Sequence, residues 1–231
     1  MDKAPLIALL AGARETPMAA EWLAQIPRVS AVVIWARGTD RADLGLVARD
    51  VVPADADAIL DVTHVFDTSA RAAAMAQAPR AAYARVGRDP WTAQRQDHWR
   101  EVDTIAEAVA ALPAGARVFA ATGRASLPAL GAHDGPVFLR QLTRHDQPTG
   151  FPDCTYIFGA APFDTRGEVA LFEQLGIDVV LARNVGGIDS FPKLAAARTL
   201  GLPVVLLRPP PLPPGPRLRS AADVATWVGS L

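Results

Sequence analysis

Short apolar runs alternate with longer amphipathic segments along most of this 231-residue sequence. The apolar runs are nearly continuous and lack a two-residue alternation, which is typical of strands covered on both faces of a parallel sheet. The runs that we expect to form strands are 6–11, 29–36, 58–62, 81–86, 118–121, 137–142, 156–159, 179–182 and 204–207. The alternation of strands with helices favours an α/β fold built from right-handed βαβ units.

The amphipathic segments carry recognisable helix signals. Thr16 stands where it can cap a first helix with Pro17 in its opening turn, and Thr68 or Ser69 where it can cap a second. Further helices are expected between 103 and 112, between 165 and 176, between 190 and 201, and from about 220 to 227.

The segment 112–115, which contains Pro113 and Gly115, is the most linker-like break near the middle of the chain. We therefore predict two Rossmann-like three-layer halves with mainly parallel sheets, comprising residues 1–112 and 116–231. The final helix is able to pack back on the first half. The proline-rich stretch 209–216 is interpreted as an extended connector.

The formal net charge of −1 provides neither a basic field for nucleic acid nor a polybasic face for a membrane. No apolar run approaches the roughly 18 to 20 residues of a membrane span. The apolar start of the chain is interpreted as a buried strand rather than a signal peptide, so we predict a cytoplasmic protein. The single cysteine, Cys154, excludes an intramolecular disulfide and lies in an aromatic stretch, which indicates a buried structural thiol.

Ligands of an open parallel sheet bind beyond the carboxyl ends of its strands, and five polar loops follow predicted strands here. The first contains Gly12, Arg14 and Glu15 ahead of a helix start that favours an anion. A phosphate site and a plain strand–helix turn are both open, because only one glycine of the dinucleotide fingerprint is present. Since Glu15 would repel a phosphate, we expect it to orient Arg14 or to cap backbone donors.

The second loop, Arg37-Gly38-Thr39, follows the second strand, where nucleotide folds meet the adenosine ribose. An acid there favours NAD, whereas an arginine suits the extra phosphate of NADP. Arg37 therefore argues for NADPH if a dinucleotide binds this half. A solvated surface arginine is the alternative interpretation.

The third loop spans 61–67. Asp61 interrupts a strand that should be wholly apolar, and a buried acid needs a partner. His64 is expected at the carboxyl edge of the sheet, either as a catalyst or as a hydrogen-bonded scaffold. No second and third ligand stands at metal spacing, so we predict no metal site.

The fourth loop is Thr122-Gly123-Arg124, and the fifth continues from Arg183-Asn184 into two adjacent glycines. These glycines permit positive φ angles and the close approach of a ligand. The fifth loop is the densest site signal in the chain; its polar and glycine residues are Arg183, Asn184, Gly186, Gly187, Ser190 and Lys193. Neither a nucleophile elbow nor a P-loop lysine motif is present, which leaves cofactor chemistry or pure binding.

Taken in order, these loops resemble the precorrin-6A reductases of cobalamin biosynthesis. The resemblance rests on 12–15, Arg37-Gly38, Asp61-x-Thr63-His64, Thr122-Gly123-Arg124, Ala161-Pro162-Phe163, Asn184-x-Gly186-Gly187 and Lys193-Leu194, with Trp91 and Trp99. It covers nearly the whole chain. The sequence departs from the family pattern at Ala11 where a glycine is usual, at Val65 where a proline is usual, and at Arg183 where a lysine is usual.

The resemblance implies a two-domain enzyme whose sheets turn their carboxyl edges to a common cleft. NADPH delivers a hydride there to a conjugated double bond of precorrin-6A, and a proton completes the reduction. The substrate is a polycarboxylate tetrapyrrole, which arginine and lysine side chains can hold in charge-assisted pairs. Transient contact with other corrin-pathway enzymes belongs to this expectation, whereas nucleic acid and membranes do not.

The same resemblance assigns roles to residues. His64 is assigned as the proton donor. The NADPH site is assigned to Gly12, Arg14, Glu15, Arg37, Gly38, Thr39, Thr63, Thr122, Gly123 and Arg124, of which the loop 122–124 is able to hold either ligand. The substrate site is assigned to Arg183, Asn184, Gly186, Gly187, Ser190 and Lys193.

Three other functions remain open. One is the cobalt-precorrin-6A reductase of the anaerobic pathway. Arg37 favours NADPH and therefore argues against this alternative. Another is a cofactor-free two-domain tetrapyrrole enzyme similar to uroporphyrinogen-III synthase. The last is a corrinoid-binding module that performs no chemistry.

Overall fold

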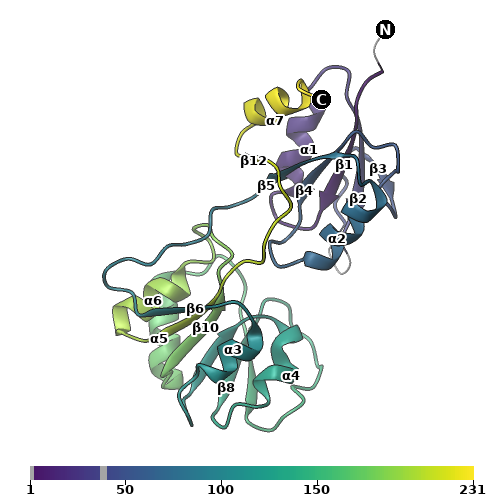
Figure 1. Ribbon diagram of the computed structural model, residues 1–231. Coiled ribbons are helices and arrows are strands. Elements are labelled where there is room, and N and C mark those ends of the chain that lie inside the picture. The colour runs from purple at the N-terminus through teal and green to yellow at the C-terminus, as the bar shows by residue number, and fades with distance from the viewer. Residues whose placement is uncertain (1–2, 37–40) are drawn as a thin grey trace. The chain divides into compact units, whose positions relative to one another are not determined.

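The computed structural model describes residues 3–36 and 41–231. The chain forms two compact units, of which unit 1 comprises Met1–Gly87 with Pro210–Leu231 and unit 2 comprises Arg88–Pro209 (Figure 1). Each unit contains a six-stranded parallel sheet with helices on both faces. The predicted α/β class with two Rossmann-like halves is therefore confirmed.

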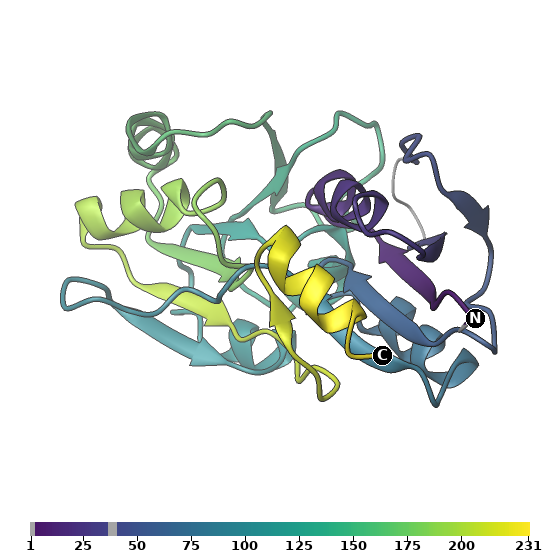
Figure 2. The ribbon, with the colours of Figure 1, turned by 90° about the horizontal axis from the view of Figure 1, so that it is seen from above.

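The sheet of unit 1 has the strand order β12-β5-β4-β1-β2-β3. Its strands are β1 (Leu6–Ala11), β2 (Ser30–Trp35), β3 (Val47–Arg49), β4 (Ala58–Val62), β5 (Ala82–Val86) and β12 (Arg217–Leu218). Its helices are α1 (Thr16–Ala24), α2 (Thr68–Gln77) and α7 (Ala221–Val228). Helix α7 packs against α1, as two views show (Figure 1 and Figure 2).

Strand β1 is buried on both faces, as its continuous apolar run predicts. Successive side chains of a strand point to opposite faces, so Ile7 and Leu9 join the core with α1 and α7, whereas Ala8 and Leu10 join the core with α2. Burying each of these leucine and isoleucine side chains contributes about 1.5 to 3 kcal/mol. The two cores fix the sheet between its helix layers.

The sheet of unit 2 has the strand order β6-β11-β10-β7-β8-β9. Its strands are β6 (Trp99–Val102), β7 (Val118–Ala121), β8 (Val137–Gln141), β9 (Cys154–Phe158), β10 (Val179–Arg183) and β11 (Val204–Leu207). Its helices are α3 (Ile105–Ala110), η1 (Arg124–Ser126), α4 (Leu127–Leu130), α5 (Thr165–Leu175) and α6 (Pro192–Leu200). Helices α5 and α6 pack together over one face, with the rings of Phe119 and Phe172 4.7 Å apart in the core between them and the sheet.

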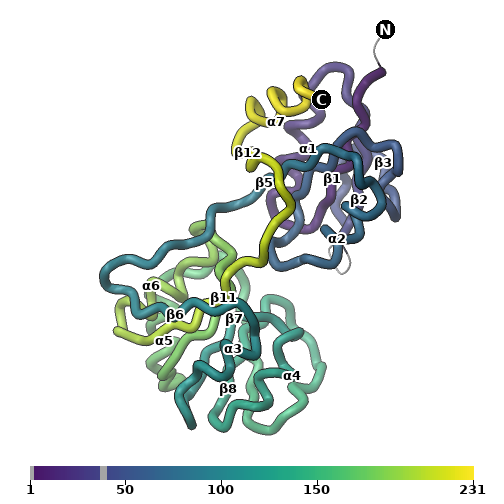
Figure 3. Tube along the Cα trace, in the orientation of Figure 1, coloured from purple at the N-terminus to yellow at the C-terminus, as the bar shows by residue number. Residues whose placement is uncertain are grey.

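In each sheet, one edge strand directly follows, in the sequence, a strand of the other sheet. Strand β6 follows β5 in sequence but pairs with β11, and β12 follows β11 but pairs with β5 (Figure 3). The boundaries of the units therefore fall after Gly87 and after Pro209, and differ from the predicted break at 112–115. Residues 88–112 belong to unit 2 because the register of β6 with β11 joins Trp99 to Val204.

Several local predictions can be compared with the structure. Gly176 and Gly201 follow the ends of α5 and α6 as predicted, and the structure shows both in the left-handed conformation. Ser220, where the last helix was predicted to begin, is the N-cap of α7. The predicted caps of the first two helices are wrong. Thr16 is the first residue of α1 and accepts a hydrogen bond from the Gly12 N–H at 3.2 Å, while Asp67 caps α2 by accepting from Ala70 N–H at 3.1 Å.

Within the described residues, none of the helices has the length and apolar character needed to cross a membrane.

Candidate active site

The strand order of both sheets places a topological switch point in each unit. Beside β1 the crossovers run to β2 on one side and to β4 on the other, and beside β7 they run to β8 and to β10. Ligands of doubly wound sheets bind beyond the carboxyl ends of the strands at such points. The loops after β1 and β4, and those after β7 and β10, are therefore the candidate sites.

In unit 1 the structure brings the first and third predicted loops together. The Ala13 N–H donates to the Val62 carbonyl at 2.8 Å, so Gly12 and Arg14 lie beside the end of β4. Glu15 occupies the N-cap position of α1 and makes no capping hydrogen bond with its side chain. This removes one of the two roles expected for Glu15.

The second predicted loop cannot be compared in the same way. Arg37, Gly38 and Thr39 lie outside the described residues. Ala36, directly before them, donates its N–H to the Ala11 carbonyl at 2.8 Å. The chain therefore enters this segment from the strand beside β1.

Asp61 has the partners that its burial requires. Its Oδ1 accepts from the Thr63 N–H at 2.8 Å and from the Thr63 hydroxyl at 2.6 Å. Its Oδ2 accepts from Arg71 Nε and from the Tyr83 hydroxyl, both at 2.6 Å. Burial alone would raise the pKa of Asp61, but Arg71 and these hydrogen bonds outweigh it and hold the pKa below its ordinary value.

This network fixes the turn after β4. Arg71 Nη2 donates to the Thr63 hydroxyl at 3.1 Å, which locks Thr63 between the acid and the arginine. His64 is exposed, and its Nδ1 accepts from the Phe66 N–H at 3.2 Å. The imidazole Nε2 is therefore the nitrogen that can carry a proton at the edge of the sheet.

In unit 2 the fourth and fifth loops also meet. Gly123 has a φ of 77°, and a Cβ added there would lie 3.7 Å from Arg183 Nη1. The Thr122 and Ser126 hydroxyls lie 2.6 Å apart, and Ser126 donates to the Gly123 carbonyl at 2.6 Å. Burial lowers the pKa of Arg183, so an anionic group beside this guanidinium would be favoured.

Asn184 and the two glycines hold another segment of the chain. Asn184 Oδ1 accepts from the Trp91 N–H at 2.8 Å, and its Nδ2 donates to the Trp91 carbonyl at 2.9 Å. A Cβ at Gly186 would lie 2.0 Å from the Asp89 carbonyl oxygen, and one at Gly187 would lie 2.3 Å from a carbon of Arg88. The close approach that these glycines permit is thus made by segment 88–91.

Lys193 lies in the first turn of α6, at the carboxyl edge of the sheet. Its ammonium donates to the Ser190 carbonyl and lies 5.3 Å from the centre of the Trp91 ring. Burial lowers its pKa to about 8. A lysine of this kind can exchange a proton near neutral pH.

Some groups at these edges escaped the sequence reasoning. Arg71 and Tyr83 donate hydrogen bonds to Asp61, and for these two residues only the acid itself gave a signal. Arg140 at the end of β8 pairs with Glu168 at 2.8 Å and stacks 4.4 Å from the centre of the Phe163 ring, beside the Ala161-Pro162-Phe163 motif. An arginine at the end of a predicted strand was the available signal for Arg85 and Arg140.

Two other predictions concern reactive groups. Cys154 is buried, which raises the pKa of its thiol to about 11 and agrees with a structural cysteine. In the part of the chain that the structure describes, no group of three or more His, Cys, Asp and Glu residues could hold a metal ion.

Comparisons with known proteins give consistent results. The family model described as precorrin-6x reductase CbiJ/CobK matches residues 43–229. This chain is similar to a precorrin-6A reductase of Rhodobacter capsulatus, at 38% identity over 74% of this chain and 69% of the relative. It is also similar to a precorrin-6A reductase of Rhodococcus erythropolis, at 35% identity over 76% of this chain and 72% of the relative.

The fold has a counterpart among solved structures. A structure named CobK precorrin-6A reductase superimposes with a TM-score of 0.76 at 30% sequence identity. The match covers 98% of this chain and 96% of that chain.

Proposed function

Because this chain belongs to the precorrin-6x reductase CbiJ/CobK family, we propose that it reduces a ring double bond of precorrin-6A with NADPH, in cobalamin biosynthesis. The match of the family model over residues 43–229 carries this proposal. Since NADPH and corrin precursors are cytoplasmic metabolites, the reaction is assigned to the cytoplasm.

The edge of unit 1 suits a nicotinamide nucleotide. The loop through Gly12 and Arg14 leads into the N-terminus of α1, whose dipole favours a phosphate. The neighbouring turn at Thr63 is held rigid by Asp61 and Arg71, which suits orientation of a ribose or nicotinamide. When bound, the dihydronicotinamide supplies the hydride; the protein contributes binding and orientation.

The cofactor choice depends on the segment after β2. Arg37, Gly38 and Thr39 are assigned to the adenosine ribose and its phosphate, on the argument that an arginine in this position suits NADP. Thr122, Gly123 and Arg124 remain assigned to the nucleotide as well.

The edge of unit 2 suits the polycarboxylate substrate. Arg183 and Lys193 are partly desolvated cations, and ion pairs in such settings are stronger than on an exposed surface. Asn184, Gly186 and Gly187 support this edge indirectly, because they hold segment 88–91 and thereby the Trp91 ring beside Lys193.

The proton of the reduction needs an acid near neutral pH. Lys193 is the better donor, because its ammonium is buried and its pKa is about 8. In this assignment the Lys193 ammonium would donate its proton to the carbon of the conjugated system that does not receive the hydride, and solvent would then reprotonate the amine. His64, whose Nδ1 accepts a hydrogen bond from the Phe66 N–H, is the alternative donor.

Calorimetric titration with NADPH and NADH tests the cofactor assignment. We expect wild type to bind NADPH at least about 10-fold more tightly, since a bidentate arginine–phosphate contact contributes about 1.5 kcal/mol or more. Arg37→Ala should abolish this preference, with Arg80→Ala as an exposed control. An unchanged preference in Arg37→Ala refutes the ribose-phosphate assignment. The absence of heat with either nucleotide favours a cofactor-free tetrapyrrole enzyme.

A further inference from the structure

Unit 1 contains a buried polar cluster at the carboxyl ends of β4 and β5. Its members are Asp61, Thr63, Arg71, Tyr83 and Arg85, all less than a tenth exposed. Asp61 accepts hydrogen bonds from the Thr63 N–H and hydroxyl, from Arg71 and from Tyr83, at 2.6 to 2.8 Å. A carboxylate offers about four acceptor positions, so Asp61 is saturated without any contribution from Arg85.

Arg85 is a surplus cation in this cluster. Its side chain is 7% exposed, and its Nη1 lies 3.9 Å from Asp61 Oδ2, beyond hydrogen-bonding distance. Among the described residues, no hydrogen-bond partner is present for Arg85 Nε and Nη1 or for Arg71 Nη1, and all three atoms are buried. Buried charged donors without partners are costly, so this arrangement calls for an acceptor.

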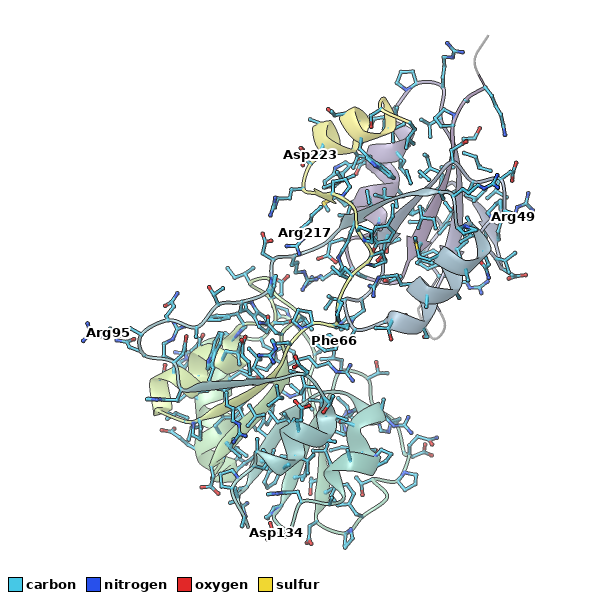
Figure 4. All side chains as sticks on the ribbon, viewed as in Figure 1. Arg49, Phe66, Arg95, Asp134, Arg217 and Asp223 are labelled. Atoms are coloured by element: carbon cyan, nitrogen blue, oxygen red, sulfur yellow. The ribbon has the colours of Figure 1, made fainter. Side chains whose placement is uncertain are left out.

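The charges around Arg85 also favour an additional anionic acceptor beside its guanidinium. Burial lowers the pKa of Arg85, and the positive charges of Arg71 and Arg217 lower it further, while Asp61 and Tyr83 raise it without reversing the shift. Arg217 stands next to Arg85 in the register of β12 with β5, and Figure 4 labels it. The pKa of Arg71, by contrast, is raised, because Asp61 outweighs its burial. Arg71 is thus the hydrogen-bonded partner of Asp61, whereas Arg85 Nη1 lies 3.9 Å from Asp61 Oδ2 and forms only a longer ion pair with it.

We propose that Arg85, together with Arg71, forms a binding site for an anionic group, a carboxylate or a phosphate, at the carboxyl end of β5. A guanidinium presents parallel N–H donors that match either group. This edge of the sheet is where ligands of doubly wound folds bind. Both molecules of the proposed reaction carry such groups, so the source of the anion, though not the site, rests on the proposed function.

Gly87 is part of the same argument. A Cβ at Gly87 would lie 2.8 Å from Arg85 Nε and 2.9 Å from Nη2, so any larger residue would displace the guanidinium. Gly87 has no positive φ in the structure, and therefore its backbone does not require glycine. The glycine keeps one side of Arg85 free of a side chain.

The variant Arg85→Met separates a ligand site from a structural ion pair. Methionine fills similar apolar space but carries no charge, so the unliganded variant should have a melting temperature equal to or above that of wild type. Wild type should be stabilised by sodium phosphate or sodium acetate beyond sodium chloride at equal ionic strength, and Arg85→Met should not. Arg80→Met, an exposed change in the same unit, should keep the wild-type response.

Kinetics identifies the molecule that supplies the anion. Arg85→Met should raise KM for either NADPH or precorrin-6A by about 10-fold or more, and the affected KM names the source. Gly87→Ala, which keeps the charge, should raise the same KM with little change in melting temperature.

Two results would overturn the proposal. One is an Arg85→Met variant that is destabilised but keeps the stabilisation by anions and both KM values. The other is a wild-type protein that phosphate and acetate do not stabilise beyond chloride. If wild type responds to anions but does not oxidise NADPH with precorrin-6A, the proposed reduction falls and the anion site stands.

Discussion

At the scale of single residues, the proposed chemistry depends on cations that are withdrawn from water. Arg183 and Lys193 both have pKa values lowered by burial, and both stand at the carboxyl edge of the unit 2 sheet. Holding a cation in this way strengthens its interaction with an incoming anion and makes a lysine a better acid.

Lys193 predicts the pH dependence of the reaction. A proton donor must be protonated to act, so kcat should be maintained below a pH of about 8 and fall as pH rises through that value. Lys193→Met should lower kcat at least about 100-fold, the usual contribution of a general acid, and lose the fall near pH 8. The pH profiles of kcat for wild type, Lys193→Met and His64→Gln check this.

The control for this prediction is His64→Gln. It should retain the fall near pH 8 if Lys193 is the donor. A profile that survives in Lys193→Met and vanishes in His64→Gln would return the role to His64.

At the scale of elements, the turn after β10 shows that a glycine-containing motif near a candidate site can hold another segment of the chain in place. The sequence reasoning assigned Asn184, Gly186 and Gly187 to the substrate. In the structure these residues contact segment 88–91 through side-chain and backbone atoms. Glycine spacing reveals that a close approach occurs, but not which group approaches.

The contact predicts unequal costs for two glycine substitutions. Gly186 and Gly45 have similar φ angles, 70° and 65°, but only at Gly186 does an added Cβ meet another atom within 4 Å, the Asp89 carbonyl at 2.0 Å. Gly45→Ala should lower the free energy of unfolding by about 1 kcal/mol, whereas Gly186→Ala should lower it by about 3 kcal/mol or more. Urea unfolding measures both, and equal losses would contradict the described contact.

Edge strands mark the limit of what apolar patterns reveal about elements. The central strands, such as β1 and β4, are buried on both faces and were predicted from their continuous apolar residues. Strands β3, β6 and β12 were missed. All three lie at sheet edges and are short or largely exposed, so backbone pairing rather than side-chain burial defines them.

At the scale of the whole molecule, the fold class was predictable from the sequence, but the boundaries of the two units were not. The reason is that the edge strands β6 and β12 pair with strands that are distant in the sequence. Burial patterns establish two parallel sheets, but they do not show that Trp99–Val102 pairs with β11. A similar limit applies to Asp61, because the sequence shows a buried acid without showing that Arg71 and Tyr83 reach it. Pairing between distant residues is a property of tertiary structure.

The proposed reaction transfers a hydride from NADPH to precorrin-6A. The most direct measurement uses NADPH carrying deuterium at the transferred position of its nicotinamide, with mass spectrometry of the corrin product. The account predicts that NADPH is consumed in step with substrate and that each product molecule gains a single deuterium on the ring. A product without deuterium, or NADPH that stays unoxidised in the presence of precorrin-6A, would contradict it.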